Sequence, residues 1–237
     1  MFNILETNLF LIIILLLMSI IIYYTVSKLI GKLIKICKVK QTGVELFISK
    51  FLLIILNLTL MVFVKIKIKD LLSIKELRTG IIFLIIGFLF SILIAFLTYQ
   101  VVKKNSLVNN YRKMVKESPF LIFLTLILLV GPAEDLLFIG ILQHVLMQKF
   151  DWIAIPIYLI IFTFYHYINV LCGAESKQEF WGMLPIRLMI SFILSFSFYK
   201  TNTLIYGLII HNIFDTLCFL GISIAVKSTK ENTTITQ

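Results

Sequence analysis

The stretch FLIFLTLILLVGPAEDLLFIGILQHVL, residues 120–146, combines a long apolar run with a helix break and two adjacent acids at its centre. An upright helix of this length would reach about 40 Å, against a hydrocarbon core of about 30 Å. We therefore expect the segment to tilt, or to kink at Gly131 and Pro132. Pro132 also lacks a backbone donor and leaves a carbonyl unpaired, which would admit water or a polar partner near Glu134.

The whole chain has the composition of an integral membrane protein. Of its 237 residues, 60% are hydrophobic, which leaves too little polar sequence to form the surface of a soluble domain. The second predicted span, 46–64, fits a membrane helix least well, because Glu45 and Lys50 lie at or near its start and Asn57 lies in its interior. We predict an all-α, polytopic transmembrane helix bundle of about seven spans, at residues 9–26, 46–64, 80–99, 120–146, 153–168, 180–199 and 204–224.

The net charge of +10 lies mostly in the connections between apolar runs, where it favours a role in membrane orientation and anionic-lipid contact over nucleic-acid binding. With the N-terminus outside, the inner connections carry 14 Lys and Arg and the outer ones 7, so we predict N-out and C-in. The outer segment 65–78 does not fit this distribution because it is rich in Lys and Arg, and we interpret it as a basic amphipathic stretch on the lipid surface. Heavy use of Ile, Lys and Asn indicates an AT-rich, bacterial genome, and hence a plasma membrane.

The first apolar run is expected to be a retained span, because the first eight residues contain no Lys or Arg and no A-x-A-like site follows. The three cysteines stand singly and predict neither a disulfide framework nor a thiolate metal site. We divide the chain into N-terminal spans with basic connections (1–118), a core that carries the chemistry (119–224) and a polar tail (225–237).

Several ionisable side chains lie inside or at the edge of predicted spans, where charge is costly and marks a site or a paired interior contact. Each has a structural explanation when taken alone. The adjacent acids Glu134 and Asp135 could cap the second half of a broken helix, and His166 could be a packing residue. The i, i+4 spacing of His211 and Asp215 places both on one helix face. His144, near the outer end of its span, is interpreted as interfacial. The set is Glu134, Asp135, His166, Arg187, His211 and Asp215.

Glu134, His166, His211 and Asp215 come from three predicted helices and together form a candidate hydrolytic centre. A buried carboxylate beside imidazoles can activate a water for attack on a carbonyl, while the remaining polar groups stabilise the oxyanion. Hydrolysis of a peptide bond fits this inventory, whereas no Ser or Cys stands in a recognisable nucleophile motif. A zinc ion held by Glu134, His166 and His211 is an open alternative, although the H-E-x-x-H spacing is absent.

Three segments in order, EDLLFIG, FTFYH and HNIFD, resemble the motifs E-E-x-x-x-R, F-x-x-x-H and H-x-x-x-N/D of the CAAX protease and bacteriocin-processing (CPBP, or Abi) intramembrane peptidases. The likeness covers residues 119–224 and implies a catalytic core in the last four spans. It implies Glu134 as the water-activating base and Phe162 as a supporting residue. His166 and His211 would share in water activation or polarise the carbonyl, and Asp215 would lie near the oxyanion. The implied substrate is a peptide or a lipidated CAAX-type protein.

The chain departs from the family pattern at two positions. Asp135 replaces the second Glu, and Ile139 stands where the pattern has Arg. In the pattern, these positions are i, i+4 and suited to an ion pair. Because an unpaired carboxylate in lipid is expensive, we expect Asp135 to be protonated or paired elsewhere. Arg187 is our hypothesis for a partial substitute for the missing partner.

Two other readings stay open. The loss of the Arg favours a non-catalytic family member, such as a bacteriocin-immunity protein or a membrane scaffold. Intramembrane charges also suit a small transporter, although the sequence shows no inverted repeat and no matching pair of broken helices.

Overall fold

The computed structural model describes residues 14, 17–18, 20–22, 24–25, 28–32, 42–104, 115, 117–172 and 175–234. Over these residues the chain forms helices and no strand. The N-terminal part of the bundle contains α2 (Thr42–Phe63), the short α3 (Ile68–Leu71) and α4 (Leu77–Lys104). The all-α prediction is confirmed.

Residues 119–150 form one long helical rod with changes of winding. It contains α6 (Pro119–Thr125), η2 (Leu126–Val130), α7 (Gly131–Asp135), η3 (Leu136–Gln143) and α8 (His144–Phe150). Both η2 and η3 are π-helical, so the helix is widened on either side of α7. π-Helical turns inside α-helices are rare and occur frequently at functional sites. Thus α7, the α-helical turn that carries the two adjacent acids, lies between two local irregularities.

The rest of the chain returns across the bundle in helices. A 3₁₀ turn, η4 (Asp151–Ile153), leads into α9 (Ala154–Tyr165) and α10 (Tyr167–Leu171). Helix α11 (Lys177–Thr201) begins with a capping box, in which Ser176 and Glu179 satisfy each other's backbone N–H groups. Asn202 adopts the left-handed conformation, with φ 51°, and ends α11 before the final helix α12 (Ile205–Thr234).

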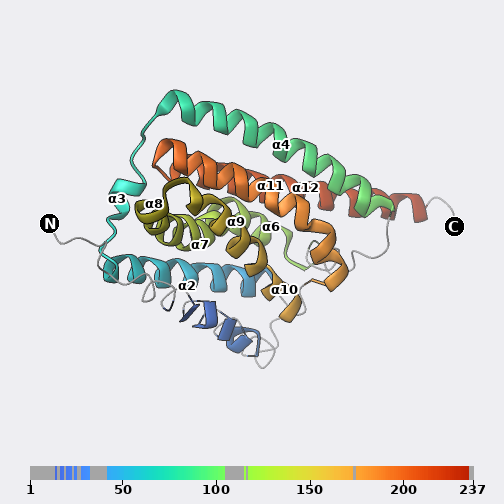
Figure 1. The fold of residues 1–237 in the computed structure, drawn as a ribbon. Helices are drawn as coiled ribbons and strands as arrows, with labels where there is room; N and C mark the ends of the chain where they lie inside the picture. Colours follow the sequence, from blue (N-terminus) through green and yellow to red (C-terminus); the bar gives the residue numbers. More distant parts are fainter. Residues whose placement is uncertain are drawn as a thin grey trace.

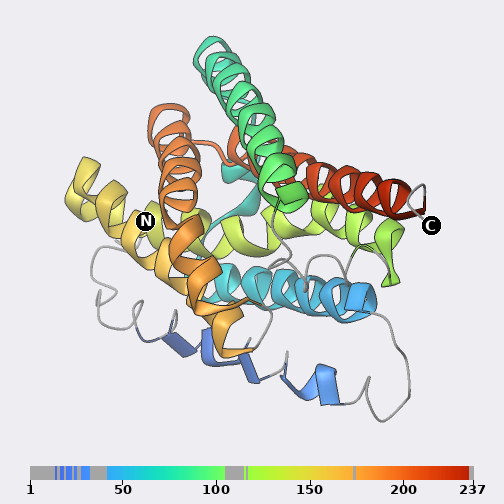
Figure 2. The ribbon, with the colours of Figure 1, turned by 90° about the vertical axis from the view of Figure 1, so that its right-hand side faces the viewer.

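The rod α6–α8 lies at the centre of the molecule. Helix α2 packs along one side of it and α12 along the other, as Figures 1 and 2 show from two directions. Helix α4 runs beside α12, and α9 packs against α11. Residues from the first, middle and last parts of the chain are therefore neighbours at α7.

Helices α4 and α12 approach closely because glycines lie between them. A Cβ on Gly221 would lie 2.5 Å from the carbonyl oxygen of Ala95, and one on Gly87 would lie 2.5 Å from Cγ2 of Ile210. Small residues that allow close backbone approach are typical of helix pairs in membranes. Helix α4 therefore packs closely along α12.

Five helical stretches are long and apolar enough to cross a membrane, among the residues that the structure describes. They are Gly43–Phe63, Leu77–Lys103, Pro119–Leu171, Lys177–Thr201 and Ile205–Ser228. The third contains 53 residues and includes both of the spans expected at 120–146 and 153–168, so six predicted spans coincide with these stretches. The first predicted span, 9–26, falls mostly outside the described residues.

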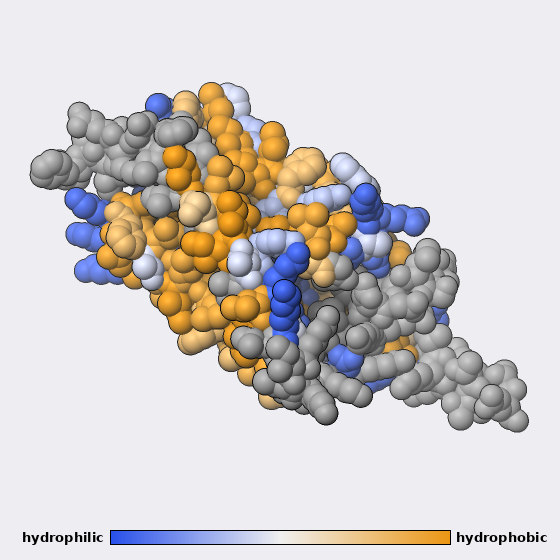
Figure 3. Space-filling model, turned by 90° about the horizontal axis from the view of Figure 1, so that it is seen from below, coloured by the Kyte–Doolittle hydropathy of each residue, from blue (hydrophilic) through white to orange (hydrophobic). Residues whose placement is uncertain are grey.

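The outer surface of the bundle is apolar, as a lipid solvent requires. Figure 3 shows hydrophobic residues over much of one face, with hydrophilic side chains toward both ends and in a group near its middle. Helix α4 contributes a row of exposed aliphatic side chains, including Ile81, Ile82, Ile85 and Leu89. Together with the apolar stretches, this surface identifies an integral membrane protein.

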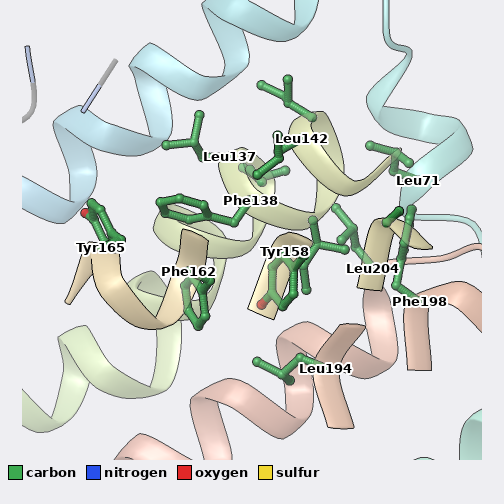
Figure 4. Close-up of a cluster of buried hydrophobic side chains, with 14 of the residues drawn as sticks. Leu71, Leu137, Phe138, Leu142, Tyr158, Phe162, Tyr165, Leu194, Phe198 and Leu204 are labelled. Carbon is green, nitrogen blue, oxygen red and sulfur yellow. The ribbon is translucent and has the colours of Figure 1, made fainter. Parts of the chain in front are cut away.

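The apolar core lies beside the π-helical segment η3. Figure 4 shows Phe138 of η3 beside Phe162 of α9, with Leu142 and Tyr158 in the same buried cluster. The rings of Phe138 and Phe162 pack edge to face with centroids 5.1 Å apart, and Tyr158 stacks on Phe162 at 5.3 Å. This aromatic cluster fixes α9 against the rod and so fixes the position of the histidine that follows Phe162 by one turn.

Candidate active site

The backbone of α7 is held from two sides by asparagines. The side-chain amide of Asn57 in α2 donates to the carbonyl oxygen of Ala133 at 2.7 Å. From α12, the side-chain oxygen of Asn212 accepts from the backbone N–H of Gly131 at 2.8 Å. A Cβ at position 131 would lie 2.6 Å from that same oxygen, so the contact requires glycine. Both asparagines thus contact α7 itself, from two neighbouring helices, while the expected partner for the carbonyl that Pro132 leaves unpaired stays a prediction.

Glu134 lies at the centre of the site and is buried, with 5% of its surface exposed. Its two carboxylate oxygens have different surroundings. Oε1 accepts from the ammonium group of Lys50 at 2.5 Å. Oε2 lies 3.7 Å from Nε2 of His166 and 3.8 Å from Nε2 of His211, and it accepts no hydrogen bond from the described residues. Both gaps exceed the usual hydrogen-bond length of about 2.7–3.2 Å.

His166 is oriented by its own helix. Its Nδ1 lies 2.9 Å from the carbonyl oxygen of Phe162, and because a carbonyl only accepts, Nδ1 carries the proton of this bond. In the neutral ring, Nε2 then presents a lone pair toward Glu134. The ring of Phe162 packs edge to face on His166, with centroids 4.9 Å apart. Phe162 thus contacts His166, and its supporting role stays a prediction.

His211 is surrounded by carboxylates. Its Nδ1 lies 2.9 Å from Oδ1 of Asp135, and its Nε2 lies 3.6 Å from Oδ2 of Asp215 one helical turn away. Asp135 is fully buried. The expectation that Asp135 is protonated or paired elsewhere is met by this imidazole, which comes from a different helix.

The hypothesis that Arg187 replaces the missing partner of Asp135 is wrong. Nη2 of Arg187 instead donates to both carboxylate oxygens of Glu175, at 2.8 and 2.9 Å. Glu175 lies outside the membrane-spanning stretches, and burial raises the pKa of its carboxyl although the guanidinium acts in the opposite direction. Arg187 therefore anchors the start of α11, where it also lies over the ring of Phe180 at 5.2 Å.

Sequence reasoning missed Lys50 as a residue of the site. In the sequence it stands only as a charge in a poor span, yet it is 7% exposed and bound to Glu134. A signal was present: Lys50 and Asn57 are seven residues apart, which is about two helical turns and places them on one face. Both reach α7, at Glu134 and Ala133.

The residues of the site do not fit the zinc ion that remained open from the sequence. Within the described parts of the chain, no group of three or more His, Cys, Asp or Glu is arranged to hold a metal. More specifically, the carboxylate that would bind zinc already binds the ammonium of Lys50. A second cation on that carboxylate would repel the first.

His144 lies away from the candidate active site. It is half-buried, its Nε2 lies 3.1 Å from Nε2 of Gln148, and it lines a hollow with Lys65, Lys75 and Asn202. Its interpretation as an interfacial histidine stays a prediction.

Fold and site together define a polytopic helical membrane protein with a buried centre of carboxylates, imidazoles and one lysine. Residues 116–217 match the family model described as Rce1-like, type II CAAX prenyl endopeptidase Rce1-like. No curated protein and no solved structure matches the chain. At the level of the family, the match supports a membrane peptidase, and it confirms the resemblance drawn from the three motifs.

Proposed function

We propose that this protein is an intramembrane endopeptidase in which Glu134 activates a water for attack on a peptide carbonyl. The observation that carries the proposal is the position of Oε2, which faces the Nε2 atoms of both His166 and His211 at 3.7 and 3.8 Å. A water off the line between Oε2 and either Nε2 would lie within hydrogen-bond reach of both atoms, at about 2.8 Å from each.

The two histidines have different parts in this proposal. With Nδ1–H bound to Phe162, His166 accepts at Nε2, so the water donates one hydrogen to Glu134 and one to His166. Its oxygen then keeps a lone pair for the carbonyl carbon. His211 has both ring nitrogens facing carboxylates, an arrangement suited to an N–H at each nitrogen. Its Nε2–H would donate to the oxyanion.

The reaction balances as a simple hydrolysis. Water oxygen bonds to the carbonyl carbon, and its proton passes to Oε2 of Glu134. The tetrahedral intermediate then expels the amine, which takes the proton from Glu134. The other product leaves as a carboxylic acid that still carries the second hydrogen of the water, and it loses this proton to the amine or to solvent, which leaves a carboxylate. Asp215 lies 3.6 Å from Nε2 of His211 and would fix the position of that ring near the oxyanion.

The proposed substrate is a peptide or lipidated C-terminal segment of the CAAX type, cleaved near the membrane face. Lys50 lies eight residues into α2, about 12 Å from its start. With the N-terminus outside, that end of α2 faces the cytoplasm. The site would therefore be reached from the cytoplasmic side, where lipidated C-terminal segments are presented.

The test is cleavage of a farnesylated CAAX peptide by purified protein in detergent, with the products identified by mass. We expect Glu134→Gln to lower kcat by about 10²–10⁴-fold, because general-base catalysis contributes that much. Glu76→Gln is the matched control, since Glu76 is exposed in the connection before α4. Equal turnover by both variants would remove Glu134 from the mechanism. If wild type cleaves nothing and partner binding survives replacement of both His166 and His211, the protein is a scaffold of the family.

A further inference from the structure

Lys50 is a buried cation in a membrane-crossing helix. Its side chain is 9% exposed, and it lies on the inner face of α2 together with the buried residues Leu53, Asn57 and Met61. A charge at such a position is expensive unless a partner of opposite sign neutralises it. Its ammonium binds Glu134, the group proposed as the base. The position of Lys50 is therefore tied to the chemistry of the site as well as to folding.

The family pattern places its cation elsewhere. It has an arginine four residues after the second acid, where this chain has Ile139, which is fully buried in the apolar core. Asp135 is paired with His211, and Arg187 with Glu175. Lys50 lies outside the residues that match the family, 116–217. The positive charge at the acidic motif thus comes from a helix that the motif does not include.

We propose that Lys50 is a positioning residue that holds Glu134 as a carboxylate with Oε2 aimed at the imidazoles. The assignment rests on the proposed function. By binding Oε1, the ammonium prevents the carboxylate from turning that oxygen toward the water and leaves one oxygen for proton transfer. It stays cationic while Oε2 gains and loses a proton, so it stabilises the carboxylate at the start and end of each turnover.

The geometry predicts an effect on turnover and not on substrate binding. Lys50 contacts the oxygen of Glu134 that does not face His166 or His211, so it lies behind the base relative to the proposed water. A peptide that approaches the water from the side of the imidazoles has no contact with the ammonium. Loss of Lys50 should therefore lower kcat and leave KM within about threefold, which separates positioning from uniform binding.

The first experiment compares Lys50→Met, Lys50→Arg and wild type in the peptide-cleavage assay. Methionine keeps most of the side-chain length but removes the charge, and we expect kcat to fall about 100-fold, the effect of a misplaced catalytic group. Arginine restores a cation, and we expect at least one tenth of wild-type kcat. Lys65→Met, which removes an exposed lysine just after the same helix, should leave kcat unchanged. Wild-type kcat in Lys50→Met, or no rescue by arginine, overturns the proposal.

The second experiment needs no substrate. Thermal unfolding in detergent is measured for wild type, Lys50→Met, Glu134→Gln and the double variant. If the two groups form the pair, Lys50→Met lowers Tm in the wild-type background, because it leaves a buried carboxylate without its cation. The same substitution lowers Tm much less in the Glu134→Gln background, where that carboxylate is absent. Equal losses of Tm in the two backgrounds overturn the pairing. If wild type cleaves no peptide, the proposed function fails, while this cycle still decides whether Lys50 holds Glu134.

Discussion

Helices α2 and α4 are both apolar spans that precede the residues matching the Rce1-like family, yet they relate to those residues differently. Helix α2 buries Lys50 and Asn57, and both contact α7. Helix α4 is more hydrophobic than α2, and its buried Ser91 donates to the carbonyl of Gly87 in the same helix. The polar residues that make α2 less hydrophobic thus contact the site, whereas α4 faces lipid and packs against α12.

Gly131→Ala changes the segment that α2 contacts, and of the substitutions that compare α2 and α4 with the site it should have the largest effect. The new methyl group would lie 2.6 Å from the side-chain oxygen of Asn212 and 3.2 Å from the carbonyl of Leu208. Helix α7 must shift, and a displacement of about 1 Å costs about 100-fold in turnover. We expect kcat for peptide cleavage to fall by about this factor and Tm to fall as well.

Gly182→Ala is the matched control, because nothing lies within 4 Å of a Cβ at that position. It lies in the interior of α11, where alanine is favoured over glycine by about 1 kcal/mol. It should leave kcat unchanged and keep or raise Tm. If the two alanine variants behave alike, the close contact between α7 and α12 has no part in positioning Glu134.

Asn57 in α2 and Ser91 in α4 are both buried and polar, so replacing each of them compares the two helices directly. Asn57→Leu removes the donor to the carbonyl of Ala133, and an unsatisfied buried acceptor costs about 1–3 kcal/mol. We expect about a tenfold loss of kcat. Ser91→Ala removes a hydrogen bond within α4 only and should leave kcat at the wild-type value. Steady-state kinetics of both variants decide the comparison, and a loss of kcat in Ser91→Ala alone would reverse it.

The smallest expected effect is that of a metal chelator. Because the ammonium of Lys50 already binds Glu134, we expect incubation with a chelator such as 1,10-phenanthroline to leave kcat and KM unchanged. The measurement is cleavage before and after dialysis against the chelator. Loss of activity that added zinc restores would contradict this expectation. It would show that Lys50 leaves the carboxylate of Glu134 when zinc binds.

Much of the central helix and its partners could be predicted from sequence. The order of the three motifs places Glu134, His166 and His211 on membrane helices, and the rings do face Oε2 of the carboxylate. The i, i+4 relation of His211 and Asp215 also follows from helical geometry alone. These predictions succeed because each depends on spacing within one segment or on the family's fixed order.

Contacts between distant segments could not be predicted in the same way. The pairing of Lys50 with Glu134 spans 84 residues, and that of His211 with Asp135 spans 76. They depend on which helix packs beside α7, and hydropathy does not encode this. The prediction for Arg187 named the wrong carboxylate for the same reason, since Glu175 lies in a connection that no sequence pattern singles out.

The proposed mechanism requires a water between Oε2 of Glu134 and an unprotonated Nε2 of His166. Nitrogen NMR of ¹⁵N-histidine-labelled protein tests it directly, because the chain contains only three histidines and each signal can be assigned by substitution. The account predicts that neutral His166 carries its proton on Nδ1, where it donates to the carbonyl of Phe162. A neutral His166 protonated on Nε2 would contradict it, since that ring could not accept a hydrogen from the water.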